Sequence, residues 1–266
     1  MDLELKGKTA IVTGGSRGIG KAIAKELARE GVEVAIVARD KAALEAAAKE
    51  IAGNSGVRVL HYSADTGDDA AVKKMVAEVA KAFGRIDILV NCAAQAGGQA
   101  KPPALGEITN EHFWSDMNIK VMGYLRTARE VAPYMIRQKS GRIINVSGLA
   151  ARNTGTIIGS MRNVSVAALT KNLADELSPH GISAVCVHPG LTRTEKTPGV
   201  VAAQAKAQGL PEAEIEKRMA GRNLARKIIT AEEIAYVCVF AASPKAVALN
   251  GDAIAAGGGS PGVIHY

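Results

Sequence analysis

Residues 9–20 read Thr-Ala-Ile-Val-Thr-Gly-Gly-Ser-Arg-Gly-Ile-Gly. The first five residues are apolar or β-branched, which is typical of a buried strand, and the glycine-rich turn leads directly into a helical pattern. Glycines in such a turn let the backbone approach a pyrophosphate closely, and the helix that follows directs its free N–H groups at the anion. The segment therefore predicts a dinucleotide-binding loop, whose expected contacts are Gly14, Ser16, Arg17, Gly18, Ile19 and Gly20.

Apolar runs and helical patterns alternate along the rest of the 266-residue chain. We expect strands at residues 9–13, 33–38, 58–63, 86–91, 141–146, 183–188 and 252–256. We expect helices at residues 18–30, 41–52, 68–83, 110–138, 159–180 and 231–242. Strands that are apolar on both faces and alternate with helices predict an α/β fold, a doubly wound parallel sheet of about seven strands with helices on both faces. We expect one Rossmann-type domain over residues 1–266, with a polar insert at about 195–225 that covers the substrate.

Composition excludes several classes of function. The net charge is +7, but Lys and Arg alternate with Asp and Glu and only 3% of residues are aromatic, so we expect no nucleic-acid partner. No apolar stretch reaches the roughly 18–20 residues that span a bilayer, so we expect no membrane partner. Cys92, Cys186 and Cys238 have neither metal-site spacing nor a disulfide framework. We therefore expect no metal, and free thiols in a reducing cytoplasm.

The end of the second expected strand indicates which nucleotide binds. An acidic residue there would bond the ribose 2′-hydroxyl of NAD, but this chain has Ala38 followed by Arg39. Arg39 and Arg17 together offer two planar guanidinium groups, which suit a 2′-phosphate. We expect NADP(H) to be preferred over NAD(H); the alternative is that both arginines are merely solvated.

Further motifs follow in a fixed order, and together they resemble the classical short-chain dehydrogenase/reductase family. They are Asp65-Thr66 after the third strand, Asn91-Cys92-Ala93-Ala94 after the fourth, and Pro189-Gly190-Leu191-Thr192-Arg193-Thr194 after the sixth. The resemblance implies hydride transfer between a nicotinamide and a small carbonyl or alcohol substrate, in a homodimer or homotetramer packed through two long helices. It also implies these cofactor contacts: Asp65, Thr66, Asn91, Ala93, Pro189, Gly190, Thr192 and Thr194.

The Asn, Ser, Tyr and Lys with which the family moves a proton are missing from their expected positions. The serine position falls on Gly148, and Ser147 stands one residue earlier, where a strand directs its side chain to the other face. The asparagine position falls on Lys120; an alignment with a local slip would place it on Asn118 instead.

The family's Tyr-x-x-x-Lys stretch has two possible alignments. An ungapped count back from the Pro-Gly motif places Tyr and Lys at Gly159 and Asn163, whereas a forward count places them at Met161 and Ser165. We prefer the first, because a length change belongs in the loop. None of the five tyrosines lies in this stretch, so the usual mechanism is not expected.

Three interpretations stay open. In the first, the chain is a reductase with a displaced acid: Lys120 supplies an ammonium group, Ser147, Ser160 or water completes the proton path, and Asn163 lies in the same site. A buried lysine near the cationic Arg162 should have a lowered pKa, although Lys120 could instead reach solvent. In the second, the chain performs other chemistry on a carbonyl compound, and in the third it binds nucleotide without catalysis.

Two further hypotheses concern the ends of the expected pocket. Arg152, Arg162 and Arg193 could bind an acidic substrate or could be solvated. His265 and Tyr266 could supply the missing acid from the C-terminal tail of a neighbouring subunit, or the tail could simply pack.

Overall fold

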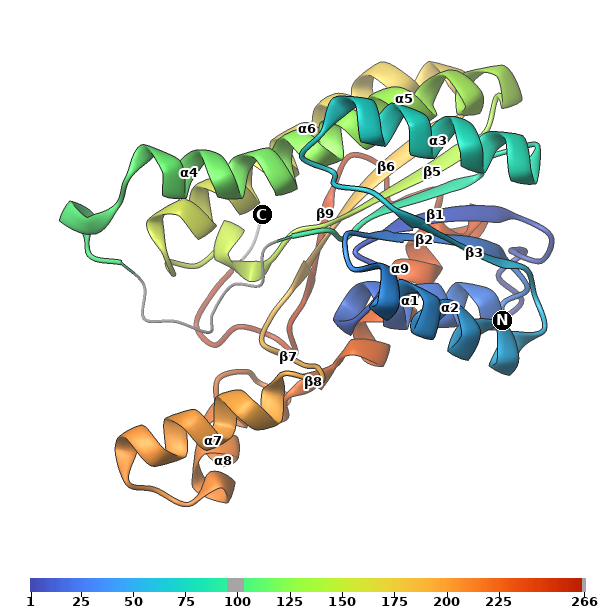
Figure 1. The fold of residues 1–266 in the computed structure, drawn as a ribbon. Helices are drawn as coiled ribbons and strands as arrows, with labels where there is room; N and C mark the ends of the chain where they lie inside the picture. The colour runs from blue at the N-terminus through green and yellow to red at the C-terminus, as the bar shows by residue number, and fades with distance from the viewer. Residues whose placement is uncertain (95–102, 265–266) are drawn as a thin grey trace.

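The computed structural model describes residues 1–94 and 103–264. Its central feature is a parallel sheet of seven strands in the order β3-β2-β1-β4-β5-β6-β9, which confirms the doubly wound sheet expected from the sequence (Figure 1). The strands are β1 (Thr9–Thr13), β2 (Glu33–Ala38), β3 (Val59–Ser63), β4 (Ile88–Asn91), β5 (Gly141–Val146), β6 (Ile182–Pro189) and β9 (Ala253–Ala256).

Helices cover both faces of the sheet. In Figure 1, α3 (Asp69–Phe83), α5 (Gly123–Gln138) and α6 (Ile157–Leu177) lie on one face. The other face carries α1 (Gly18–Arg29), α2 (Lys41–Ser55) and α9 (Ala231–Ala242). Successive strand side chains point to opposite faces, so Val12 packs in the core under α1, α2 and α9 while Ile11 packs in the core under α3 and α5. The central strand β1 is therefore buried on both faces, which is why its residues are apolar or β-branched throughout.

The sequence signals for helix ends are observed as local contacts. Asp40 precedes α2, and its carboxylate accepts a hydrogen bond from the Ala43 N–H at 3.1 Å. Gly56 ends α2 with φ of +72°, a left-handed conformation that glycine adopts without steric penalty. Side-chain caps of this kind satisfy backbone N–H groups that a helix cannot pair internally.

The single helix predicted at residues 110–138 is wrong in one respect. The chain forms α4 (Asn110–Met117), then a π-helical turn at Asn118–Met122, and then α5. A π-helical turn accommodates one extra residue and so changes which side chains face inward. Lys120 lies in this turn and is buried, a consequence that periodicity alone did not predict.

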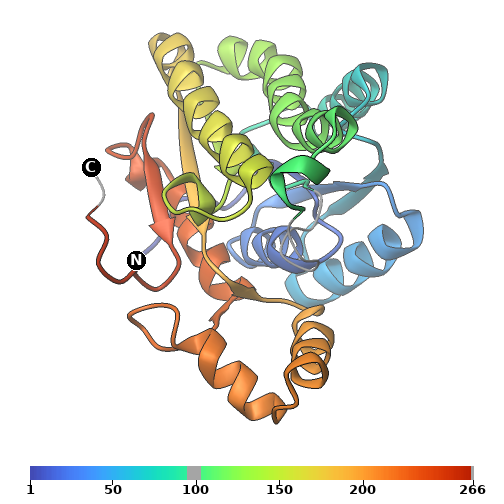
Figure 2. The same cartoon turned by 90° about the vertical axis from the view of Figure 1, so that its left-hand side faces the viewer.

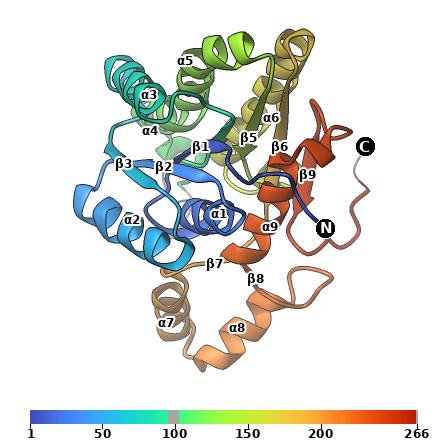
Figure 3. The ribbon, with the colours of Figure 1, turned by 90° about the vertical axis from the view of Figure 1, so that its right-hand side faces the viewer.

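The insert at 195–225 contains two helices, α7 (Thr197–Gln208) and α8 (Glu212–Ala220). Both helices lie beyond the edge of the sheet, as Figures 1 and 3 show. They share a small apolar core around Val201, Ile215 and Met219. A two-stranded ribbon of β7 (Thr192–Arg193) and β8 (Ile229–Thr230), which the sequence patterns did not reveal, joins the insert to the sheet. The carboxyl ends of the strands and the insert thus face a common space (Figure 2).

Candidate active site

A cleft of about 1150 Å³ opens at the carboxyl ends of the central strands, next to the insert. Ligands of doubly wound sheets bind at this edge, where the strand order reverses between β1 and β4. The cleft brings together every predicted cofactor contact except one. Those that line it are Gly14, Ser16, Arg17, Gly18, Ile19, Gly20, Arg39, Asp65, Thr66, Ala93, Pro189, Gly190, Thr192 and Thr194.

The glycine-rich loop has the close packing that a dinucleotide needs. A β-carbon built on Gly20 would lie 2.3 Å from the Gly14 carbonyl oxygen, and one on Gly14 would lie 2.9 Å from the backbone of Cys92 and Ala93. The loop therefore admits no side chain at either position, so that its backbone can approach a pyrophosphate closely. These observations fit a pyrophosphate at the N-terminus of α1.

Glu195, at the start of the insert, contacts this same loop. Both of its carboxylate oxygens accept from the Gly18 N–H, at 3.1 and 3.3 Å. An acidic side chain thus lies where the anion of a cofactor is expected. Glu195 could not be predicted from the sequence, because no motif marks a contact between residues 177 positions apart.

Two arginines lie at the end of the cleft where adenosine is expected. Arg17 and Arg39 line the cleft and are exposed, so both guanidinium groups are accessible to a ligand. Asp65 lies nearby in the lining, and its carboxylate accepts from the Gly67 N–H at 2.8 Å. The backbone contact fixes the orientation of this carboxylate.

Asn91 is the predicted cofactor contact that does not line the cleft. It is fully buried, donates to Asn145 Oδ1 at 3.0 Å and accepts from Thr127 Oγ1 at 2.6 Å. Asn145 in turn donates to Thr170 at 2.9 Å. This network links β4 and β5 to α5 and α6, so Asn91 fixes the packing around the cleft.

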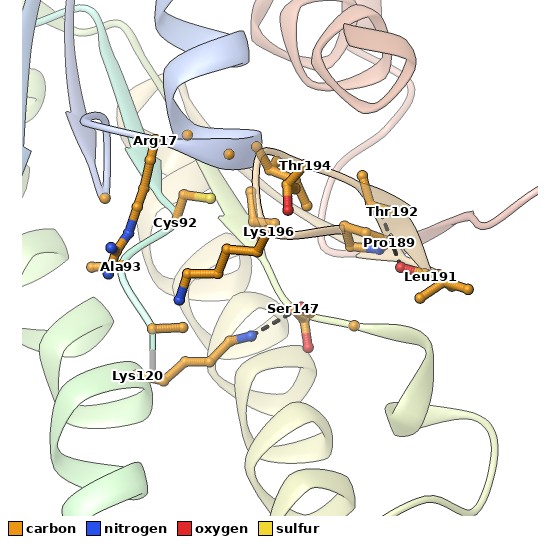
Figure 4. Close-up of a pocket in the computed structure, with 18 of the residues that line it drawn as sticks. Arg17, Cys92, Ala93, Lys120, Ser147, Pro189, Leu191, Thr192, Thr194 and Lys196 are labelled. Atoms are coloured by element: carbon orange, nitrogen blue, oxygen red, sulfur yellow. Dashed lines mark hydrogen bonds between the residues drawn. The ribbon is translucent and has the colours of Figure 1, made fainter. Parts of the chain in front are cut away.

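Lys120 reaches into the cleft from the π-helical turn. Its side chain is almost completely buried, at 4% exposure, and Nζ donates to the Ser147 carbonyl oxygen at 2.9 Å (Figure 4). Burial is the main cause that lowers the pKa of Lys120 to about 7, and the positive charge of Arg162 lowers it further. An amine with this pKa holds its proton on about half of the molecules near neutral pH, which suits a general acid. Asn118, the alternative match, instead donates to the Gly67 carbonyl and does not line the cleft.

The three arginines proposed for an acidic substrate all have protein partners. Arg162 lines the cleft, but both carboxylate oxygens of Asp116 accept from its Nη1 at 2.7 Å. Arg193 pairs with Glu216 at 2.9 Å, and Arg152 donates to the Ala253 carbonyl at 2.8 Å. The charges of Arg162 and Arg193 are thus paired with carboxylates, whereas the partner of Arg152 is a neutral carbonyl that does not offset its charge.

The remaining catalytic candidates divide into those that line the cleft and one that does not. Ser147 lines it, but its hydroxyl donates to the Asn163 carbonyl at 3.0 Å, away from the position of the family's serine. Asn163 also lines the cleft and is 4% exposed. Ser160 is not among the lining residues.

The two alignments of the Tyr-x-x-x-Lys stretch place different residues near the cleft. In the preferred alignment Asn163 lines the cleft and Gly159 does not, whereas in the other Met161, which is 49% exposed, and Ser165 both lie outside the lining. No tyrosine of the described residues lines the cleft; Tyr124 is buried and donates to the Val146 carbonyl at 2.8 Å, and burial raises its pKa well above the usual range. His265 and Tyr266 lie outside the described residues.

Comparison with known proteins shows which family the chain resembles. The model of the short chain dehydrogenase family matches residues 8–205, which is most of the chain. The chain belongs to the short-chain dehydrogenase family. The family resemblance expected from the sequence is thus confirmed, and the chain is an NAD(P)-dependent oxidoreductase that acts on small carbonyl or alcohol compounds.

Similar members of this family are reductases and dehydrogenases. The short-chain reductase protein NovJ of Streptomyces niveus is 34% identical over 253 residues, 95% of this chain and 93% of that protein. Sorbitol dehydrogenase of Cereibacter sphaeroides is 34% identical over 247 residues, 92% of this chain and 93% of that protein. The crystal structure of L-sorbose reductase from Gluconobacter frateurii, complexed with NADPH and L-sorbose, superposes with a TM-score of 0.91 at 30% identity, covering 99% of this chain and 100% of that one.

This short-chain dehydrogenase also has lining residues that sequence reasoning missed. Lys196 extends into the cleft in Figure 4, and Arg222 and Asn223 of the insert line the cleft as well. The insert has no motif, so only the fold reveals them. None of the described helices is long and apolar enough to cross a membrane, and the described His, Cys, Asp and Glu side chains form no cluster suited to a metal ion.

Proposed function

We propose that this chain is an NADP(H)-dependent reductase of a small carbonyl compound, in which Lys120 replaces the family tyrosine as proton donor. The observation that carries the proposal is the burial of Lys120 in the cleft with its Nζ bonded only to a carbonyl oxygen among the described residues. Within residues 1–94 and 103–264 no carboxylate bonds this ammonium, so its proton can be transferred.

The cofactor preference rests on Arg17 and Arg39. Two accessible guanidinium groups at the adenosine end of the cleft match a 2′-phosphate, and the last residue of β2 is Ala38 rather than an acid that could bond a free 2′-hydroxyl. The NADPH complex of L-sorbose reductase supports the same preference by analogy.

Each group in the cleft has a separate role in the proposed reaction. NADPH supplies the hydride when it is bound. Lys120 in its ammonium form donates a proton to the carbonyl oxygen as negative charge develops there, and the neutral amine left behind is stabilised by burial and by Arg162. The Ser147 carbonyl fixes the position of Nζ. Water that enters the cleft returns the proton to Lys120.

The assembly and the insert complete the proposal. We infer that α7 and α8 cover the bound substrate, because Val200, Met219 and Arg222 of the insert line the cleft. A homodimer or homotetramer is supported by apolar side chains left exposed on α4 and α6, such as Trp114 at 64% and Val164 at 51%. The free thiols of Cys92, Cys186 and Cys238 support a location in the reducing cytoplasm.

A comparison of two lysine variants tests the function. We expect Lys120→Met to bind NADPH as the wild type does, measured by cofactor fluorescence, and to oxidise it with a panel of ketones and aldehydes at least 100-fold more slowly. Lys196→Met is the matched control, because Lys196 lines the same cleft but is exposed. Binding without turnover in the wild type would contradict the reductase, and retained turnover in Lys120→Met would remove Lys120 from the mechanism.

A further inference from the structure

Gly148 and Asn163 pack against each other at the position where the family's serine is expected. A β-carbon built on Gly148 would lie 2.9 Å from Asn163 Nδ2 and 3.5 Å from its Cγ. The amide of Asn163, carried by α6, therefore fills the volume that a serine side chain after β5 would need. The two departures from the family pattern are one coupled change.

The backbone does not require glycine at this position. Gly148 has φ of 174° and ψ of 154°, an extended conformation that any residue adopts. The obstacle to a side chain at position 148 is therefore the Asn163 amide itself. A larger residue at 148 requires the Asn163 amide to move or to be replaced by a smaller side chain.

Asn163 has no evident structural reason to be polar. Its side chain is 4% exposed, and Oδ1 is buried without a hydrogen-bond partner among the described residues. A buried polar atom without a partner destabilises a fold, and an apolar side chain of similar shape would relieve that penalty. Asn163 nevertheless lines the cleft, and Nδ2, the atom of the amide that can donate, is not one of these buried atoms without a partner. A polar side chain kept in a ligand cleft at this cost indicates a role in binding.

Lys120 reaches the same short stretch of backbone from a different element. Its Nζ donates to the carbonyl oxygen of Ser147, the residue that immediately precedes Gly148. Asn163 Nδ2 lies over Gly148. The π-helical turn and α6 thus bring two nitrogen donors to one peptide unit at the floor of the cleft.

We propose that the Asn163 amide replaces the family's serine as the hydrogen-bond donor that orients the carbonyl oxygen of the substrate, beside Lys120. Asn163 Nδ2 donates to the oxygen and holds it within reach of the Lys120 ammonium. The role of Asn163 in a reduction rests on the proposed function. Binding of the carbonyl group by Asn163, however, can be measured without hydride transfer.

The test uses the oxidised cofactor, which has no hydride to give. Acetone, hydroxyacetone, cyclohexanone and ethyl acetoacetate are titrated into the protein saturated with NADP⁺, and the ketone that binds most tightly is used for all variants. We expect Asn163→Leu to weaken ketone binding about 3- to 10-fold, the value of one neutral hydrogen bond. NADP⁺ affinity should change less than about 2-fold, and the melting temperature should stay equal or rise. If Asn163 had only a structural role, Asn163→Leu would lower the melting temperature and leave ketone affinity unchanged.

A reciprocal exchange gives a second, independent readout. Gly148→Ser alone should lower both the melting temperature and ketone affinity, because its side chain overlaps the Asn163 amide. Combining Gly148→Ser with Asn163→Ala should restore both, since the overlap is removed and a hydroxyl donor stands in the family's position. Gly155→Ser is the control, because a β-carbon there meets nothing closer than 3.6 Å. Asn163→Asp, which keeps the shape and loses the N–H donor, replaces Asn163→Leu if the latter does not fold.

The outcomes separate this inference from the proposed function. Ketone binding that depends on Asn163 in a protein that never oxidises NADPH would support the inference and end the reductase proposal. Turnover in the wild type with ketone affinity unchanged in Asn163→Leu would overturn the inference and leave the reductase intact. Absence of ketone binding to the NADP⁺ complex of the wild type would also overturn it.

Discussion

Lys120 owes its chemistry to its surroundings. Removing an ammonium group from water disfavours the charged form, and the nearby Arg162 guanidinium disfavours it further. Both effects act in the same direction and lower the pKa of Lys120 to about 7. The sequence could suggest this lowered pKa from the neighbouring cation, but not the burial, because burial depends on the π-helical turn.

The lowered pKa makes stability depend on pH in a direction that can be measured. In the unfolded chain Lys120 keeps its proton up to about pH 10.4, whereas in the folded state it loses it near pH 7. The contribution of Lys120 to the free energy of unfolding is therefore constant below pH 7 and rises between pH 7 and about 10, by up to about 1.4 kcal/mol per pH unit.

Lys120→Met should remove this rise, as followed by urea unfolding from pH 6 to 10. The unfolding free energy of the variant minus that of the wild type should stay constant below pH 7 and fall between pH 7 and 10. Lys196→Met, at an exposed lysine, should keep the wild-type slope. Equal slopes for Lys120→Met and the wild type would mean that Lys120 is not buried as described.

Among single residues, Arg39 is also central to the proposed preference for NADP(H). Arg39→Asp should weaken NADPH binding about 10-fold or more and NADH binding much less, because a carboxylate repels a 2′-phosphate but can accept from a 2′-hydroxyl. Fluorescence titrations with both cofactors measure this. Lys49→Asp, an equal charge change at an exposed position of α2 outside the cleft, is the control. Equal weakening of both cofactors by Arg39→Asp would contradict the 2′-phosphate argument.

At the scale of elements, the start of α1 and the start of the insert meet at Glu195. Its carboxylate accepts from the Gly18 N–H, at the end of α1 that favours negative charge. A cofactor phosphate at this end would lie close to that carboxylate and be repelled by it.

Glu195→Gln should therefore tighten NADPH binding about 3-fold at low salt, with a smaller gain at high salt because ions screen an exposed charge. Glu212→Gln, an exposed acid on α8 outside the cleft lining, should leave the affinity unchanged. Weaker NADPH binding in Glu195→Gln would show that the carboxylate supports the loop when cofactor is bound.

Elements with strong local signals were predictable, and those set by tertiary contacts were not. The strands at Thr9–Thr13 and Gly141–Val146 are observed where the apolar runs place them, and Asp40 caps α2 as expected. The π-helical turn at Asn118–Met122 has no such signal, because its residues also fit a regular helix. The β7–β8 ribbon pairs residues 37 positions apart in two short segments, each too brief to show periodicity.

The cofactor half of the site was accessible to sequence reasoning because backbone geometry requires its glycines. Gly14 and Gly20 tolerate no side chain, so their spacing is a readable constraint. Asn91 was predicted as a cofactor contact but lies in a buried network with Asn145 and Thr127. The substrate half, with Arg222 and Asn223, depends on how the insert packs against the cleft, and no local sequence pattern predicts this.

At the scale of the whole molecule, exposed apolar side chains on α4 and α6 form the surface where copies of the chain would meet in the proposed oligomer. Met161 and Val164 are about half exposed, on the same helix as the cleft residue Asn163. Burying such side chains between subunits would also brace the helix that positions Asn163.

Val164→Glu should therefore reduce the mass measured by light scattering from two or four times 27.6 kDa to smaller species. Leu224→Glu, at a 67% exposed position in the insert, should leave the mass unchanged. A wild-type protein of 27.6 kDa would contradict the proposed oligomer.

The pH dependence of carbonyl-dependent NADPH oxidation tests the proposed reductase and its proton donor together. With a ketone or aldehyde that the wild type reduces, the rate at saturating substrate should fall above pH about 7, approaching tenfold per pH unit, as Lys120 loses its proton. Arg162→Gln should move this fall to higher pH, because it removes the cation that lowers the pKa of Lys120. Lys120→Met should show a residual rate without that fall. A wild-type rate that is independent of pH between 6 and 9, or one that Lys120→Met reproduces, would contradict the assignment of Lys120 as the proton donor.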